Sequence, residues 1–256
     1  MEPLARSAEA DAFLDARQFT APDVLSACEG WTAHEVTAHL AATAAEITRH
    51  LQPYLQGEPI PQTRSFEQRE PPYRELSNAA LLARLEAEDA SMREALVQVL
   101  GKEPDAVIPW TGRQMAVAKF LPHMRNEYAV HRWDFVGDDD TSTQLLSQPE
   151  LTAHAVSVLG EILLRRGRQH DPSPEQDFHV RLRATDAAGP DVEVVVDSGH
   201  AALHEASGHG DEPYVEMDAA ARTLFIWGRR PDHRGRIRSH LDQPTLQRLQ
   251  ALLAGY

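Results

Sequence analysis

Cysteine and lysine are nearly missing from this sequence of 256 residues, which holds one cysteine, Cys28, and two lysines. A single cysteine excludes an internal disulfide framework and a zinc knuckle made of several thiolates. No run of 18 or more apolar residues is present, which excludes a membrane-spanning helix. The N-terminus also lacks the basic and apolar segments of a signal peptide, so we expect a cytoplasmic protein.

Positive charge is scarce as well, with 25 basic against 39 acidic side chains and a formal net charge of −14. An acidic surface repels phosphate backbones, so we expect no nucleic-acid partner. Of the basic residues 23 are arginine, a bias that is typical of GC-rich genomes. The composition is otherwise 42% hydrophobic and 25% charged, which is ordinary for a globular protein of one large or two modest domains.

The hydrophobic pattern divides the chain into a helical part, residues 1–170, and a smaller part, residues 175–256. In the helical part, Thr32 and Glu35 form a capping-box pattern, which predicts the start of a helix. Residues 52–74 hold five prolines and predict a long irregular connection. Apolar residues at helical spacing predict helices over 3–18, 32–51, 77–100, 114–136 and 149–168. Four long helices among these, joined by loops, predict a four-helix bundle.

From residue 177 the hydrophobic period changes to two, which is typical of strands. Apolar and polar residues alternate over 178–183 and 192–197, and the turn-forming segment between them predicts a hairpin. The remaining expected elements are a strand over 201–206, a helix over 217–227, a strand over 235–240 and a helix over 244–254. The predicted fold class is therefore a two-domain α+β protein, with an N-terminal four-helix bundle and a small C-terminal α/β domain.

Candidate metal ligands lie on the helix predicted over 114–136. His123, Glu127 and His131 follow one another at intervals of four residues, so their side chains share one helix face. Imidazole and carboxylate groups are common ligands of Zn²⁺ and other divalent ions. For His123 three roles stay open: a fourth ligand, a base beside the ligands, or a solvent-facing side chain.

Spacing alone does not separate a metal site from a structural histidine. The pattern Glu-x-x-x-His occurs six times in the sequence, and a buried histidine bonded to a carboxylate is the alternative interpretation. His39 lies on the apolar face of its predicted helix and needs a polar partner there. By contrast, His50, His154 and His209 lie near helix ends or in a glycine-rich loop, so we expect them at the surface.

Three segments resemble one known family. GWTAHEVTAHL at 30–40 and NEYAVHRWD at 126–134 are similar, in the same order, to the two signature motifs of the mycothiol-dependent maleylpyruvate isomerase family. LFIWGRR at 224–230 resembles a segment of that family's small sterol-carrier-like C-terminal domain. The resemblance therefore spans nearly the whole chain.

This resemblance implies a DinB-like bundle that binds a divalent metal, normally Zn²⁺, through His39, Glu127 and His131. It also implies mycothiol, the low-molecular-weight thiol of actinobacteria, as a second cofactor, and the arginine-rich composition agrees with such a source. The implied reaction is cis–trans isomerisation of an electrophilic small molecule or S-transfer of the thiol to it. We expect a monomer or a homodimer.

The same chemistry suggests roles for residues outside the ligand set. Asp134 can orient a ligand imidazole or cap its helix, and we favour the first role. Arg229 and Arg230 are candidates to hold a substrate carboxylate, because guanidinium groups bind carboxylates through two parallel hydrogen bonds. The alternative for them is a pair of surface arginines. Cys28 is expected to be structural, since the reactive sulfur would come from the small-molecule thiol.

Two other classes of function remain open at this point. The chain can be a non-catalytic module that binds a metal, a thiol or an apolar ligand. It can also be a metal-dependent hydrolase that uses a bound water. Arginines that converge on the metal ligands would favour an enzyme over a binding module, and a need for added thiol would exclude the hydrolase.

Overall fold

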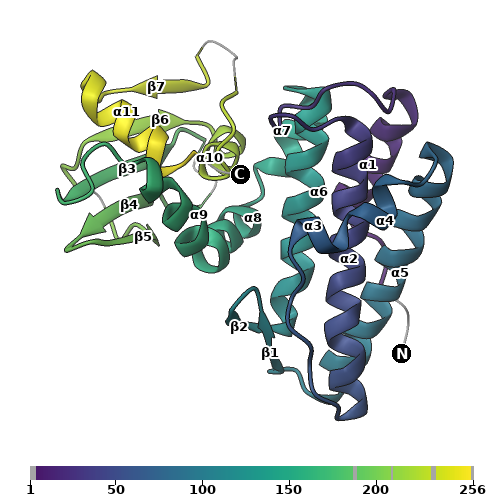
Figure 1. Ribbon diagram of the computed structural model, residues 1–256. Coiled ribbons are helices and arrows are strands. Elements are labelled where there is room, and N and C mark those ends of the chain that lie inside the picture. Colours follow the sequence, from purple (N-terminus) through teal and green to yellow (C-terminus); the bar gives the residue numbers. More distant parts are fainter. Residues whose placement is uncertain (1–3, 187–188, 209, 232–234, 255–256) are drawn as a thin grey trace. The chain divides into compact units, whose positions relative to one another are not determined.

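The computed structural model describes residues 4–186, 189–208, 210–231 and 235–254. The chain divides into two compact units, which meet in sequence between Val136 and Gly137 (Figure 1). We call the first part unit 1 and the second part unit 2. The hydrophobic pattern places this division near residue 170 instead, because the segments after residue 140 have the same helical period as the bundle. No helix among the described residues is long and apolar enough to cross a membrane.

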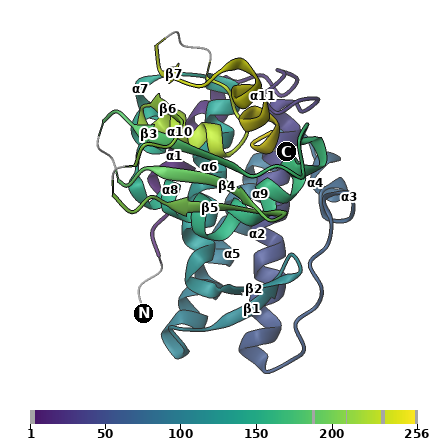
Figure 2. The ribbon, with the colours of Figure 1, turned by 90° about the vertical axis from the view of Figure 1, so that its left-hand side faces the viewer.

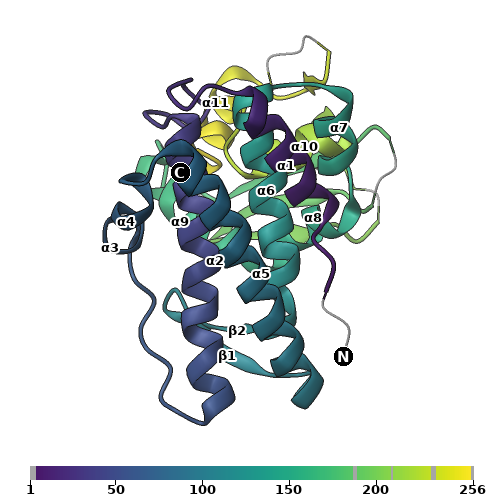
Figure 3. The ribbon, with the colours of Figure 1, turned by 90° about the vertical axis from the view of Figure 1, so that its right-hand side faces the viewer.

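Long helices form the frame of unit 1 (Figure 3): α1 (Ala8–Phe19), α2 (Ala33–Gln56), α5 (Asn78–Lys102) and α6 (Phe120–Val136). Helix α2 packs along α5, and α1 packs on α6. Phe13 and Tyr128 meet between α1 and α6, with their ring centroids 5.6 Å apart. The predicted four-helix bundle is therefore confirmed for unit 1.

Helix α2, which carries the first candidate ligand, begins where the sequence predicts. The Thr32 hydroxyl accepts a hydrogen bond from the Glu35 N–H, and the Glu35 carboxylate accepts one from the Thr32 N–H, so the capping box is confirmed. The helix stops at Gly57, whose φ of 72° lies in the left-handed region. Its buried face holds many alanines, and such small side chains let neighbouring helices approach closely.

Unit 1 also contains short elements that the hydrophobic pattern does not predict: helices α3 (Phe66–Arg69) and α4 (Pro71–Arg74), and strands β1 (Val107–Trp110) and β2 (Arg113–Ala116). The two helices fall within the segment expected to be irregular, because four residues are too few to show a hydrophobic period. The β1–β2 hairpin occupies the expected start of the last bundle helix, so α6 begins at Phe120 rather than at residue 114.

A buried carboxylate fastens the long connection before α3 to helix α2, along which this connection runs (Figure 3). Glu46 on α2 is fully buried, and its oxygens accept hydrogen bonds from Arg49 and from the side chain and backbone N–H of Arg64. One turn further, His50 Nδ1 lies 2.8 Å from the Glu46 carbonyl oxygen, and His50 Nε2 lies 3.2 Å from the Thr63 hydroxyl. The connection is therefore held in place by polar contacts rather than by apolar packing alone.

The sheet of unit 2 has the strand order β5-β4-β3-β6-β7 (Figure 2). Its strands are β3 (Phe178–Ala184), β4 (Val192–Asp197), β5 (His200–Glu205), β6 (Tyr214–Met217) and β7 (Ile237–Ser239). Strands β3 and β6 are parallel, and the other neighbours are antiparallel. The predicted hairpin is confirmed as β3–β4, with Val180 opposite Val194. The hydrophobic pattern does not predict β6, because its four residues pair with a strand far away in sequence.

The helices of unit 2 are α7 (Asp140–Leu146), α8 (Pro149–His154), α9 (Gly160–Gly167), α10 (Ala219–Ile226) and α11 (Gln243–Leu252). Helix α9 packs against β5, and α10 contacts α7, α8 and β3. The Thr223 hydroxyl of α10 lies 2.9 Å from the Thr152 hydroxyl and 3.0 Å from the Leu146 carbonyl oxygen. These contacts explain why the helices after residue 136 belong with the sheet and not with the bundle.

The expectation that His50 and His154 are surface residues is wrong, because both side chains are buried. His50 lies well inside α2, and its ring packs edge-on against Trp110 at 5.1 Å. His154 ends α8, but a π-helical turn carries the chain directly on into α9, so this position is not an exposed helix end. His209 lies outside the described residues.

The hydrogen bonds of Glu46 should make the stability of the folded chain depend on pH. Burial alone would raise the pKa of the Glu46 carboxyl, but the hydrogen bonds from Arg49 and Arg64 lower it to about 2, from an ordinary value of 4.5. Such a shift stabilises the folded chain above pH 4.5, and this contribution is lost as the pH falls towards 2. We expect Glu46→Gln to lower the free energy of unfolding at neutral pH by about 2 kcal/mol, since partly exposed arginines are screened by solvent.

Urea unfolding followed by tryptophan fluorescence at pH 7 and pH 3 measures this difference. The matched control is Glu58→Gln, which removes an exposed carboxylate of the same connection. A Glu46→Gln protein as stable as the control at pH 7, or a deficit that does not shrink at pH 3, contradicts the assignment.

Candidate metal centre

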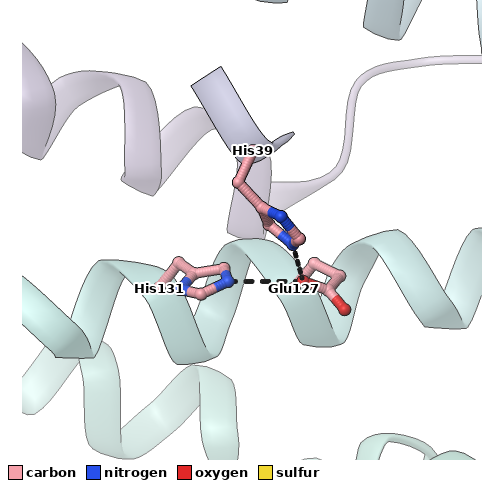
Figure 4. A group of neighbouring side chains, drawn as sticks. All are labelled: His39, Glu127 and His131. Atoms are coloured by element: carbon pink, nitrogen blue, oxygen red, sulfur yellow. Dashed lines mark ion pairs between the residues drawn. The ribbon is translucent and has the colours of Figure 1, made fainter. Parts of the chain in front are cut away.

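Three buried side chains of unit 1 converge from two helices (Figure 4). His39 comes from α2, and Glu127 and His131 lie one turn apart on α6. One ligand atom from each side chain lies within 4.8 Å of the other two. Glu127 Oε2 is 3.4 Å from His39 Nε2 and 3.4 Å from His131 Nε2. The structure therefore brings together the three residues that the family resemblance implies as ligands.

A second carboxylate orients each of the two imidazoles. His39 Nδ1 lies 2.7 Å from Glu70 Oε1, and His131 Nδ1 lies 2.8 Å from Asp134 Oδ2. A carboxylate at Nδ1 fixes the proton on that nitrogen, so the lone pair of Nε2 faces the other members of the group. Arg74 donates to Glu70 at 2.7 Å and to Glu35 at 2.9 Å. These two bonds of Arg74 hold the Glu70 carboxylate in place.

The carboxylates of this site favour positive charge next to them. Burial alone would raise the pKa of Glu127, but its hydrogen bonds with His131 and His39 hold the pKa well below the ordinary value, so the group is ionised. Burial alone would lower the pKa of His131, but Asp134 and Glu127 outweigh it and raise that pKa. Two carboxylates therefore stabilise positive charge at a single buried imidazole.

His123 lies beside this group and not within it. It is buried, so the solvent-facing alternative is wrong. Its Nε2 is 3.6 Å from Glu127 Oε1, the oxygen that does not face His39 and His131. Among the described residues of unit 1, His39, Glu127 and His131 are the group whose ligand atoms all lie within 4.8 Å of one another, and His123 is not part of it. Burial lowers the pKa of His123, and although Glu127 opposes this shift, the positive charges of Arg113 and Arg69 add to it.

Aromatic and cationic side chains surround His39. The rings of Trp31 and Phe66 lie 5.2 Å and 5.1 Å from the His39 ring, by centroid. Arg69 stacks on Phe66 at 4.8 Å and donates to the Thr43 hydroxyl at 3.1 Å. Sequence reasoning misses Arg69, Phe66 and Glu70, because they come from the segment expected to be irregular and no spacing links them to His39.

The two arginines predicted to hold a substrate carboxylate lie in unit 2, directly after α10. Arg229 is buried and donates to the Trp227 carbonyl oxygen at 3.0 Å. Arg230 donates to four backbone carbonyls, those of Phe225, Arg229, Gln250 and Leu253. Burial lowers the pKa of Arg230 to about 10. A carboxylate that bound Arg230 would compete with these bonds, which link the end of α10 to α11.

A second group of potential ligands, His179, Glu193 and Glu212, lies on unit 2. Arg181 Nη2 is 2.7 Å from a Glu193 oxygen and 3.1 Å from a Glu212 oxygen, so an internal cation already pairs with both carboxylates. We therefore assign no metal to this group.

A helical bundle that offers two histidines and one glutamate from two of its helices, followed in sequence by a small sheet-containing unit, is the arrangement that the family resemblance implies for a DinB-like bundle with a small second domain. The chain belongs to the family described as mycothiol maleylpyruvate isomerase N-terminal domain, whose sequence model matches residues 4–135. The family resemblance and the two-domain α+β fold class inferred from the sequence are both confirmed.

Solved structures support the same fold. The chain is similar to a crystal structure of the mycothiol-dependent maleylpyruvate isomerase, with a TM-score of 0.62 and 18% identity over 91% of this chain and 88% of that one. A histidine-to-alanine mutant of that enzyme matches with a TM-score of 0.61, the same identity and the same coverage. No curated protein sequence matches the chain. At this identity the likeness establishes the fold.

The paired carboxylates make a prediction for metal affinity. We expect Asp134→Asn and Glu70→Gln each to weaken Zn²⁺ binding by about 10- to 100-fold, because the ligand imidazoles lose the partners that fix their orientation and basicity. Titration of the metal-free protein with Zn²⁺ in a calorimeter measures the effect. Glu75→Gln, an exposed carboxylate at the end of α4, serves as control, and Zn²⁺ affinities equal to that control would exclude the orienting role.

Proposed function

We propose that the protein is a metal- and mycothiol-dependent enzyme that acts on an electrophilic small molecule. The reaction is maleylpyruvate isomerase-like cis–trans isomerisation or S-transfer of the thiol. The observation that carries this proposal is the convergence of His39, Glu127 and His131, with both Nδ1 atoms occupied by carboxylates. Family membership over residues 4–135 supports the choice of mycothiol as the thiol.

The donor set fits a divalent ion, and Zn²⁺ is the natural candidate. Two imidazole nitrogens and one ionised carboxylate are ligands that Zn²⁺ prefers, and three protein ligands leave one position open, as in catalytic zinc sites. A divalent ion held there would lower the pKa of a coordinating thiol and so supply a thiolate nucleophile at neutral pH.

Each of the surrounding residues has a separate task in this proposal. Glu70 and Asp134 keep the protons of the two imidazoles on Nδ1, so that both Nε2 lone pairs stay available. Trp31 and Phe66 pack against His39 and exclude water from that side of the ligand set. Arg229, and Arg230 after it, remain the residues of unit 2 proposed to hold a substrate carboxylate.

The cellular setting follows from the same chemistry. A protein that uses a reduced small-molecule thiol works in the cytoplasm, where thiols are kept reduced. Cys28, the one cysteine of the chain, is buried, which agrees with a reactive sulfur borrowed from the small molecule. The arginine-rich composition agrees with an actinobacterial source, in which mycothiol is made. We propose a monomer or a homodimer.

Metal content tests the proposal first. We expect the purified protein, after exposure to Zn²⁺ and desalting, to hold about one ion per chain, as three converging ligands require. His131→Ala should lose both the ion and the affinity for mycothiol, whereas His170→Ala, at an exposed histidine of unit 2, should keep both. Wild-type protein that contains no metal after repletion with Zn²⁺ contradicts the proposal.

Thiol dependence separates the enzyme from its two rivals. We expect the Zn²⁺-loaded protein to convert maleylpyruvate or a related α,β-unsaturated acid only when mycothiol is added, because the one thiol of the chain, that of Cys28, is buried. A spectrophotometric screen of such acids, with and without mycothiol, measures this. Turnover without thiol would identify a hydrolase, and binding of metal and thiol without turnover of any acid would identify a binding module.

A further inference from the structure

Glu70 divides its two carboxylate oxygens between a proposed metal ligand and a cation. Oε1 lies 2.7 Å from His39 Nδ1, whereas Oε2 accepts hydrogen bonds from Arg74 Nη2 at 2.7 Å and from Arg74 Nε at 3.2 Å. Glu70 is buried, so solvent does not replace a partner that is lost. Rotation of this carboxylate away from His39 would break two charge-assisted hydrogen bonds to Arg74. The contact between Oε1 and His39 therefore depends on Arg74.

Arg74, the last residue of α4, is itself fastened to the first turn of α2 at two points. Its Nη1 donates to Glu35 Oε1 at 2.9 Å, and its carbonyl oxygen lies 3.0 Å from His34 Nε2. A carbonyl oxygen can only accept, so His34 Nε2 carries the proton of this bond. The guanidinium that holds Glu70 is thus fixed to the helix that carries His39.

Glu35 uses a different oxygen for each of two tasks. Oε2 accepts hydrogen bonds from the N–H and the hydroxyl of Thr32, at 2.8 Å and 2.9 Å, which completes the capping box of α2. Oε1 binds Arg74 instead, which helix capping does not require. A continuous path of polar contacts therefore runs from Glu35 through Arg74 and Glu70 to His39.

Trp31 contacts both Arg74 and His39. The guanidinium carbon of Arg74 lies over the Trp31 ring, 5.2 Å from its centroid, and the ring centroids of Trp31 and His39 are also 5.2 Å apart. A cation over the face of an indole is attracted by the electrons of the ring. Two carboxylates and one aromatic ring therefore hold the planar guanidinium, and the ammonium group of a lysine would not reproduce all three contacts.

We propose that Arg74 and Glu35 are positioning residues for the proposed metal ligand His39. Glu35 holds Arg74, and Arg74 holds Glu70 where it keeps the imidazole proton on Nδ1. This inference rests on the proposed function, and it gives a task to the Glu35 oxygen that does not cap α2. The alternative is an ion pair that only stabilises the fold. Because both side chains are partly exposed, such a pair would contribute little to stability.

A double-mutant cycle on Zn²⁺ affinity tests whether Arg74 acts through Glu70. We expect Arg74→Gln to weaken Zn²⁺ binding by about tenfold, because the carboxylate that orients a ligand loses its support. If the effect passes through Glu70, Arg74→Gln should add less than about twofold to the loss that Glu70→Gln causes alone. Calorimetric titration of the metal-free, full-length proteins measures these affinities. Arg74→Lys, which keeps the charge and loses the fork, should give an intermediate loss.

Glu35→Gln separates positioning from helix capping. A glutamine at this place still accepts the Thr32 N–H, as in other capping boxes, but it removes the negative charge that binds Arg74. We expect a urea midpoint close to that of wild type, with Zn²⁺ binding weakened by about three- to tenfold, because the change acts one contact further from the ligand. The control is Arg84→Gln, which removes an exposed ion pair of α5 and should change neither quantity.

The proton on His39 Nδ1 gives a measurement that needs no metal. An imidazole proton held in a buried hydrogen bond exchanges slowly with water, because the bond must open first, and it gives its own signal in the ¹H–¹⁵N NMR spectrum. We expect this signal in metal-free wild-type and Arg84→Gln proteins. In Arg74→Gln it should be lost through faster exchange with water.

Two results would overturn the positioning role of Arg74. One is an Arg74→Gln protein that keeps the Nδ1 signal and binds Zn²⁺ as tightly as Arg84→Gln. The other is a fully additive loss of Zn²⁺ affinity in the double variant with Glu70→Gln, since Arg74 would then not act through that carboxylate. Zn²⁺ affinity of Glu35→Gln equal to that of Arg84→Gln would overturn the role of Glu35.

The proposed function is judged separately from this inference. Wild-type protein whose Nδ1 signal depends on Arg74 but which binds no Zn²⁺ supports the positioning of His39 and contradicts the metal- and thiol-dependent enzyme. Wild-type protein that binds Zn²⁺ and mycothiol, with an Arg74→Gln variant that matches it in Zn²⁺ affinity and Nδ1 signal, supports the enzyme and contradicts the positioning role.

Discussion

The orientation of two imidazoles by two carboxylates is the constraint on which the rest of unit 1 depends. A buried histidine can turn either ring nitrogen towards a neighbour, and only a fixed partner on Nδ1 keeps Nε2 directed at Glu127. Asp134 supplies that partner from the helix of His131 itself, three residues further on. Glu70 supplies it for His39 from a different segment, which the fold must therefore hold in place.

Much of the long connection between α2 and α5 serves to hold Glu70 in position. Glu46 on α2 fastens the part before α3 through Arg64. Helices α3 and α4 then bring Arg69 and Glu70 against α2, where Arg69 contacts the Thr43 hydroxyl and Glu70 contacts His39 Nδ1. Because these contacts are buried and charged, loss of one partner leaves a group unsatisfied, which costs more than the bond itself contributes. A segment rich in proline is in this way fixed to α2 by polar contacts.

Local patterns in the sequence predict the parts of this site that are close together along the chain. Glu127, His131 and Asp134 share one helix face, so their spacing predicts that they lie together once the helix is recognised, although it does not show what they bind. His39 requires the family resemblance, because no spacing relates α2 to α6. Glu70 and Arg69 are not predictable from pattern at all, since they reach the site through packing of helices only four residues long.

The same distinction between local and distant contacts explains the fold. The bundle helices and the β3–β4 hairpin follow from hydrophobic period and turn residues. The boundary at Val136 and strand β6 do not, because they depend on which distant surface a segment packs against. Arg230 is an example of a single residue whose contacts the sequence does not predict. The motif that contains it suggests a carboxylate-binding arginine, whereas its guanidinium donates to four backbone carbonyls of its own unit.

Coordination of Zn²⁺ by His39, Glu127 and His131, and of mycothiol by the bound ion, is tested most directly by X-ray absorption at the zinc edge of the Zn²⁺-loaded protein, recorded with and without mycothiol. We expect two imidazole nitrogens and one carboxylate oxygen at about 2.0–2.2 Å, and one additional sulfur neighbour at about 2.3 Å when the thiol is present. A zinc ion without imidazole neighbours, or a coordination shell that gains no sulfur on addition of mycothiol, would contradict this coordination.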